Sequence, residues 1–212
     1  MAPVRVAVLL LLALAAGCAS YASRATARPA PVGHTTVAIA ADAVVFEHGR
    51  EYFVAPSPEL SVRRGMSERW DLGGRFGFGS AEVAATVRLR DGENWALAAV
   101  PNAGLGFVPV TNNGTDLLRL HAGARLVLER DLSDGVAVAA SAGGRFALTG
   151  PGTIFGGEAG ELRVLTEPSV SLGLRIKAGS RVVWPEVGMV LPVDFGTGAE
   201  KPAVQAGVAL EF

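Results

Sequence analysis

Three features of this 212-residue sequence predict an all-β fold, an antiparallel up-and-down β-barrel of about ten strands, with eight as a smaller alternative. Half of the residues are hydrophobic, glycine is abundant at 27 residues, and lysine, a good helix former, is scarce. Apolar and polar residues alternate with a period of two along most of the chain, and turn residues separate the alternating stretches. No stretch with helical periodicity and helix caps competes with this interpretation.

Ten segments after residue 34 have the strand pattern. They cover residues 35–47, 58–65, 69–78, 81–90, 94–107, 116–129, 135–148, 162–177, 182–195 and 203–212. Tight polar turns are expected at residues 66–69, 91–93, 131–134 and 179–180, and mostly longer loops at residues 49–57, 111–115, 150–161 and 196–202. Short turns at one end and longer loops at the other, with an even strand number, are typical of transmembrane barrels.

The two sides of the strands differ in character. Along residues 116–129, leucine and alanine fill one side, whereas the other carries Arg119, His121, Arg125 and Glu129. The polar sides are rich in glycine, serine and alanine with isolated charges, as a crowded lumen requires. The candidate lumen polar network consists of Arg75, Arg88, Arg119, His121, Arg125, Glu129, Arg145, Arg175 and Glu186. Whether the apolar face points to lipid or to a core stays open here.

Residues 179–180 predict a two-residue turn that fixes the pairing of the strands beside it. In this register Ile176 faces Val183 and Leu172 faces Val187, so apolar residues meet apolar residues. Proline cannot donate a hydrogen bond to a neighbouring strand. Pro185 therefore predicts a local irregularity, and Pro168 and Pro192 predict that regular pairing ends at their level.

The N-terminus predicts an export signal. After Arg5, residues 6–16 are uncharged, which is too short for a membrane-spanning helix but suits the apolar region of a signal peptide. The only cysteine, Cys18, follows in the sequence L-A-A-G-C, which resembles the lipobox of bacterial lipoproteins, with Ala15 where leucine is usual. This resemblance implies a lipid attached to Cys18; the alternative is cleavage after residues 20–22, with Cys18 discarded.

The predicted organisation is a lipoprotein-type signal peptide at residues 1–17, a disordered tether at 18–34 and a β-barrel domain at 35–212. The last strand alternates and stops at Phe212, and so resembles the closing strand of bacterial outer-membrane β-barrels. In that family the terminal aromatic residue is the signal that the barrel-assembly machinery reads. The resemblance implies a protein of the Gram-negative outer membrane, exported from the cytoplasm and lipid-anchored, integral or both. Its implied partners are the lipid bilayer and the barrel-assembly and lipoprotein-sorting machinery.

The sequence contains no recognisable chemistry. It has no metal-binding spacing and no phosphate-binding glycine motif, so no catalytic residue, metal site or cofactor is predicted. With 19 basic and 20 acidic residues and no basic patch, nucleic acid is not an expected partner. The first expectation is a small outer-membrane barrel with a structural or surface-binding role and a plugged lumen.

Other interpretations remain open. One is a lipid-anchored periplasmic protein, a lipocalin-like barrel or β-sandwich that binds an apolar ligand inside. Two more are a narrow anion-selective channel lined by arginine and a membrane-barrel hydrolase. The oligomeric state is left open.

Overall fold

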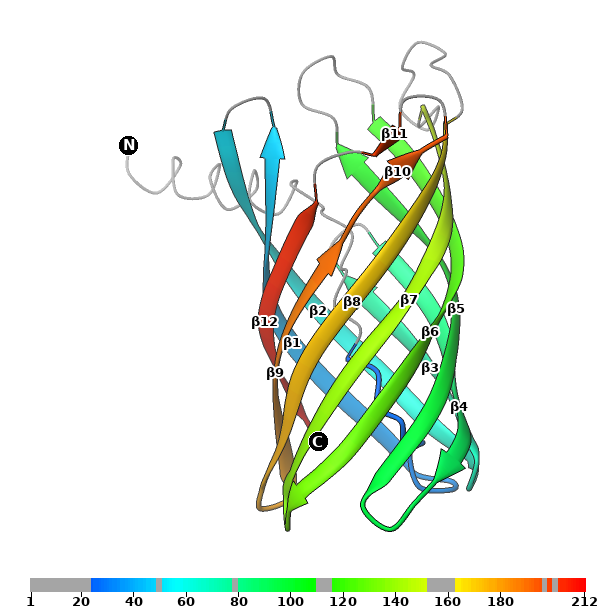
Figure 1. The fold of residues 1–212 in the computed structure, drawn as a ribbon, viewed down its shortest axis with the longest axis vertical. Helices are drawn as coiled ribbons and strands as arrows, with labels where there is room; N and C mark the ends of the chain where they lie inside the picture. Colours follow the sequence, from blue (N-terminus) through cyan, green and yellow to red (C-terminus); the bar gives the residue numbers. More distant parts are fainter. Residues whose placement is uncertain are drawn as a thin grey trace.

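The computed structural model describes residues 24–48, 51–77, 80–109, 116–151, 163–195, 198–199 and 202–212. In chain order the strands are β1 (Thr35–His48), β2 (Glu51–Ser67), β3 (Trp70–Gly77), β4 (Ser80–Asp91), β5 (Trp95–Pro109), β6 (Asp116–Ser133), β7 (Val136–Pro151), β8 (Arg163–Ala178), β9 (Arg181–Val190), β10 (Val193–Asp194), β11 (Gly198–Ala199) and β12 (Ala203–Glu211). They tilt around one central axis (Figure 1). Within the described ranges no helix is long and apolar enough to cross a membrane.

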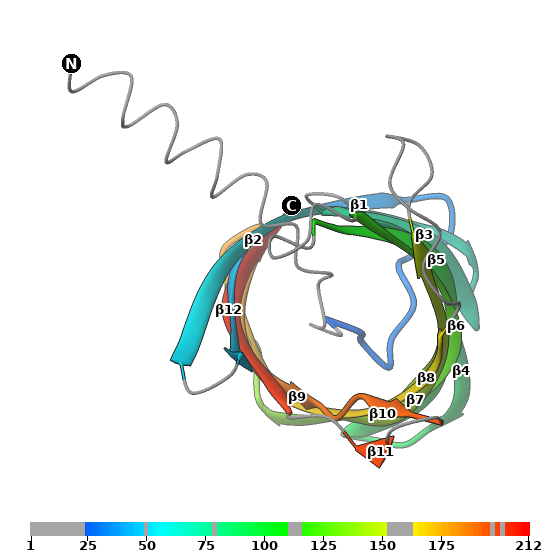
Figure 2. The ribbon, with the colours of Figure 1, turned by 90° about the horizontal axis from the view of Figure 1, so that it is seen from above.

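The sheet closes into a barrel. Ten long strands form the wall, and β10 and β11, with two residues each, extend it at one end. Strand β12 pairs antiparallel with β9 on one side and with β1 on the other, from Ala38–Glu211 to Val45–Val204, which completes the ring (Figure 2). The predicted fold class, an antiparallel up-and-down barrel of about ten strands, is confirmed.

The turn between β8 and β9 has the predicted register. Gly179 has a φ of 66°, a left-handed conformation that glycine adopts easily, and Ile176 pairs with Val183 as expected. Pairing skips Pro185 and resumes at Gly173–Glu186, so the predicted irregularity is present. The expected end of pairing at Pro168 is only an interruption, because β10 continues in the same register with Val193 opposite Thr166.

The predicted loop at residues 49–57 is wrong over residues 51–57, which belong to β2. Strands β1 and β2 pair up to His48–Glu51, and the upper part of their hairpin projects from the barrel (Figure 1). The predicted strand begins only at residue 58. β3 pairs with β2 only from Glu59 onward, so in the described structure the other edge of β2 is free at Pro58 and Pro56, where proline is tolerated.

The wall is a single layer, so each strand has one face toward the lumen and one toward the outside. Large apolar side chains lie outside and remain half-exposed, for example Leu126, Leu172 and Phe76. Charged side chains lie inside, where glycines on neighbouring strands make room for them. A Cβ atom on Gly207 would lie 1.7 Å from Asp42 Oδ1, and one on Gly104 would lie 2.8 Å from the His121 ring.

Candidate functional site

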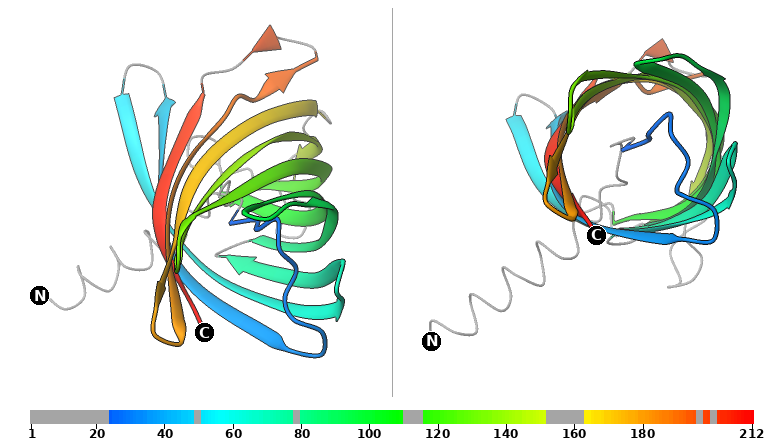
Figure 3. Two further views of the ribbon diagram at one scale, coloured as in Figure 1. Left: turned by 60° about the horizontal axis from the view of Figure 1, so that its bottom comes forward. Right: turned by 90° about the horizontal axis from the view of Figure 1, so that it is seen from below.

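The interior of the barrel contains part of the chain's own N-terminal region. Residues 24–34, hereafter the lumen segment, run inside the ring of strands and lead into β1 (Figures 2 and 3). Arg24, Thr26, Ala27 and Ala30 are buried there. For these residues the predicted disordered tether is wrong, because carboxylates of the wall bind the segment. Residues 18–23, with Cys18, lie outside the described residues.

The lumen segment is bound most tightly at Arg24. Its backbone N–H donates to Glu186 over 2.9 Å, and its guanidinium donates to Glu59 over 3.2 Å and forms an ion pair with Asp42. Asp42 also accepts a 2.8 Å hydrogen bond from the Gln205 amide. The side chains of Arg24, Asp42 and Glu59 are 5%, 0% and 3% exposed, so this cluster is almost fully removed from water.

Glu129 binds the middle of the segment. Its carboxylate accepts hydrogen bonds from the Thr26 hydroxyl over 2.5 Å and from the Ala27 backbone N–H over 3.1 Å. Arg175 donates to its other oxygen over 2.9 Å. Glu129 is completely buried, so these three donors replace the water that the carboxylate loses.

The end of the segment lies near the short turns. Arg28 donates two hydrogen bonds to the Asp131 carboxylate, one of them over 2.8 Å, and these bonds raise the pKa of Arg28 above its usual range. The Ala30 backbone N–H donates to the buried Asp71 over 2.8 Å. Gly65 makes room where the segment leaves the lumen, since a Cβ there would lie 2.1 Å from the Pro31 carbonyl oxygen.

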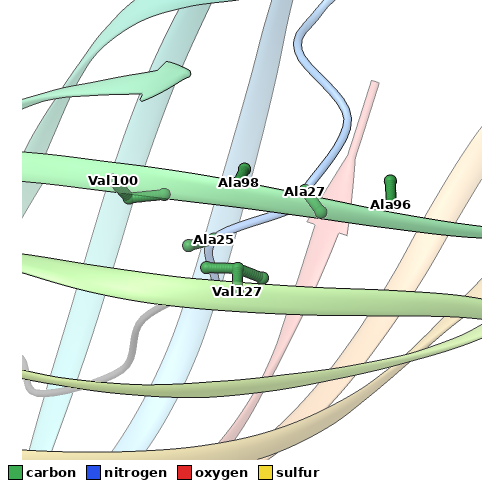
Figure 4. Packing of buried hydrophobic residues seen from close by; sticks show 6 residues of the cluster. All are labelled: Ala25, Ala27, Ala96, Ala98, Val100 and Val127. Carbon is green, nitrogen blue, oxygen red and sulfur yellow. The ribbon is translucent and has the colours of Figure 1, made fainter. Parts of the chain in front are cut away.

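Small apolar side chains fill the space between the segment and the wall (Figure 4). The cluster consists of Ala25, Ala27, Ala96, Ala98, Val100 and Val127. Only small residues leave enough room for a second chain inside a barrel of this size, which explains the alanines on the inner face of β5.

A second group of charged side chains spans the lumen, and the hydrogen bonds within it join residues of the wall strands only. Glu82 accepts a 3.1 Å hydrogen bond from Arg75 Nε, and its other oxygen lies 3.1 Å from His121 Nε2. Glu167 accepts a 2.6 Å hydrogen bond from Arg145 and pairs with Arg119. Four residues of the candidate network thus lie in the lumen core or beside it, and all are buried except the partly buried Arg75.

The remaining candidates lie elsewhere or are bound differently. Arg88 pairs with Asp91 over 2.9 Å beside a short turn, where both are partly exposed. Arg175 lies 5.2 Å from the centre of the Trp184 ring. Arg125 is buried on the inner face, and Phe212 is half-exposed at the barrel's outer surface, 5.4 Å from the Arg181 guanidinium.

Several residues of this interior were not predicted from the sequence. Arg24 and Thr26 were assigned to the tether, and Asp42 and Gln205 were not in the candidate network. Asp42 had a readable signal, because it is an acid on an otherwise apolar alternating strand and lies on the same side as Ala40 and Val44. Arg24 had none, since only the folded barrel brings it to three carboxylates.

Acids exceed arginines on the inner face. Among the described residues, and without the ion pairs Arg28–Asp131, Arg88–Asp91 and Arg163–Asp194 near the two ends of the barrel, the charged side chains on the inner faces of the strands are six arginines and eight acids. They are Arg63, Arg75, Arg119, Arg125, Arg145 and Arg175, and Asp42, Glu59, Asp71, Glu82, Glu129, Glu167, Glu186 and Glu211. The cation supplied by Arg24 therefore offsets part of a negative wall. Among the described residues no group of three histidine, cysteine or acidic side chains has the geometry to hold a metal.

No protein-family model matches the sequence, and comparison with curated proteins finds no match. Solved structures with a similar shape include Neisserial surface protein A (TM-score 0.48, 11% identity, 84% of this chain and 95% of that one). Another is the translocator domain of autotransporter NalP from Neisseria meningitidis (TM-score 0.45, 13% identity, 86% and 89%). A third is Ail, the attachment invasion locus protein of Yersinia pestis, in complex with a heparin analogue (TM-score 0.41, 11% identity, 86% and 100%). The assignment of the fold rests on the strand pairing described above.

Proposed function

We propose that this protein is a small integral β-barrel of the bacterial outer membrane, with a structural or surface-binding role and a lumen closed by residues 24–34. The observation that carries the proposal is the distribution of side chains across the one-layer wall. Apolar residues cover the outside, and buried charges fill the inside.

The outer apolar surface has the height of a bilayer. On β6 the outward residues from Leu118 to Leu128 are all leucine or alanine, and the next outward residue toward the short turn is the exposed Arg130. Ten steps of about 3.3 Å along a strand tilted by about 40° rise roughly 25 Å, which is the usual height of the apolar band of a membrane barrel.

Aromatic side chains support the same placement. Trp70, Trp95 and Phe212 are 39%, 36% and 51% exposed and lie on the outer surface near the short turns. Aromatic rings concentrate at membrane–water interfaces, where an apolar body and a polar edge both find a favourable environment. Transmembrane barrels have short periplasmic turns, so we place the end with the tight turns after β2, β4, β6 and β8 in the periplasm. The opposite end then faces the outside of the cell, where a surface-binding role would operate.

The lipocalin-like alternative has the opposite arrangement. A barrel that stores an apolar ligand needs an apolar interior, whereas Glu129, Asp71 and Glu167 are buried inside this one and Leu120, Val170 and Met189 are exposed outside. The closed ring also differs from a β-sandwich, which has two separate sheets.

The lumen segment supports closure to solutes. Its ion pairs and hydrogen bonds reach Asp42, Glu59, Asp71, Glu129 and Glu186, and its alanines pack against the inner face of β5. We expect negligible conductance from the full-length protein in planar bilayers. Stable open channels would contradict a closed lumen.

Membrane integration has a direct test. The expressed full chain should remain in the outer-membrane fraction after a urea wash, and its mobility on a detergent gel should change on boiling, as closed barrels do. A protein that enzymatic removal of its lipid releases into the soluble fraction would refute the integral barrel.

A further inference from the structure

Arg125 differs from the other buried arginines of the lumen. It lies on the inner face of β6 and is 5% exposed, yet in the described structure its guanidinium forms no ion pair and no hydrogen bond. Arg145 and Arg119, by contrast, both bind Glu167. A guanidinium does not lose its proton in a protein, so the charge of Arg125 persists and requires a counter-charge.

Arg125 lines a cavity of about 50 Å³ in the lumen. One ordered water needs about 10–15 Å³, so the cavity has room for a small ion with a companion water. Trp184 and Arg24 line the same cavity, and the indole N–H of Trp184 and the Nε–H of Arg24 are buried without an acceptor. Two N–H groups that lack an acceptor, together with the guanidinium of Arg125, therefore line one space.

The carboxylates around this cavity are already paired. Asp71 and Glu211 bind Arg63, and Glu82 binds Arg75. Arg24 itself is paired with Asp42 and Glu59. Arg125 is therefore the one arginine lining the cavity without a paired carboxylate among the described residues, although acids are in excess over the whole inner face. Counted over the lining alone, four arginines face three carboxylates; with Asp42 and Glu59, which bind Arg24 from behind the lining, the carboxylates number five.

We propose that this cavity binds one small monovalent anion of halide size, such as chloride. Arg125 supplies the counter-charge and Trp184 supplies a neutral N–H donor. The lining excludes larger organic anions by volume. The site rests on the barrel fold and the position of the lumen segment, and it is independent of the membrane role proposed above.

The test compares salts on the purified full-length protein in detergent. Thermal unfolding, followed by loss of β-sheet circular dichroism, is measured in sodium chloride or bromide and in sodium gluconate at equal ionic strength. We expect a saturable rise in unfolding temperature with the two halides and none with gluconate. Arg125→Gln should weaken the apparent halide affinity by at least about a hundredfold, because the counter-charge is gone.

Arg130→Gln is the matched control, since Arg130 lies on the same strand but on the outer surface, and it should keep the halide effect. Trp184→Phe keeps a ring and removes only the N–H, so it should weaken halide affinity by about tenfold even if Arg125→Gln fails to fold. Crystals grown in bromide should show an anomalous peak in the cavity. The proposal is overturned by a wild-type protein indifferent to halide, by an unchanged effect in Arg125→Gln or Trp184→Phe, or by bromide bound only elsewhere.

Discussion

Substitution of Arg24 by alanine should release the lumen segment from the barrel wall. The side chains of Arg24 and Asp42 are 5% and 0% exposed, and removal of the cation leaves Asp42 and Glu59 buried with fewer partners. Removing one partner of a buried ion pair costs about 3–5 kcal/mol. The wall carboxylates regain water if the segment leaves the lumen, so this cost favours the open state.

Arg28→Ala is the matched control on the same segment. Arg28 and its partner Asp131 each have 34% of their side chain exposed, and such a pair contributes about 0–1 kcal/mol. Both substitutions therefore remove an arginine that pairs with an aspartate of the wall, but the Arg24 pair is buried and the Arg28 pair is partly exposed.

Hydrogen exchange of the Ala27 and Ala30 backbone amides measures the release, since these amides donate to Glu129 and Asp71. At 1.4 kcal/mol per factor of ten, Arg24→Ala should speed their exchange by roughly 10²- to 4 × 10³-fold, and Arg28→Ala by less than about fivefold. Equal exchange rates in the two variants would refute the assignment of Arg24 as the main attachment of the segment.

Three further predictions concern the wall, the open lumen and the anchor. Gly123→Ala places a Cβ 2.3 Å from the Gly144 carbonyl oxygen, so it should destabilise the barrel by about 1–3 kcal/mol in denaturant titrations. In the control Gly144→Ala, the new Cβ has no neighbour closer than 3.5 Å, and the stability should not fall. Equal effects of the two substitutions would show that the inward glycine is not needed for space. Replacing residues 24–31 with a glycine–serine sequence of equal length should give channels in planar bilayers that prefer cations, because eight acids face six arginines; anion preference would contradict this charge balance. Cys18→Ala should abolish labelling by a fatty-acid analogue, and persistent label would exclude lipid attachment at that cysteine.

The strands and most turns were predictable because their signals are local. Alternation in residues 116–129 places Arg119 and Leu120 on opposite faces of any strand, whatever lies beside it. Gly179 likewise marks a tight turn, and the turn sets the register of its two strands. The longest stretch not predicted as strand is residues 51–57. Pro56 and Pro58 are unfavourable inside a sheet, and only the structure shows that β3 pairs with β2 no further than Glu59.

The lumen segment was not predictable in the same way. The sequence from Arg24 to Gly33 is rich in alanine and proline and has no periodic pattern, so it has the composition of a linker. Its order comes from groups distant in the chain, such as Glu186, which lies 162 positions from Arg24.

The sequence by itself determined the wall of this protein: which residues form strands, which face of each strand is apolar and where the short turns lie. Tertiary structure alone decided that the apolar face points outward and that the chain's own N-terminal region occupies the lumen. The physical reason is the separation along the chain between the residues that interact. Strand alternation acts between residues two positions apart, whereas the pairing of a buried charge such as Arg24 or the isolation of one such as Arg125 depends on the whole closed ring.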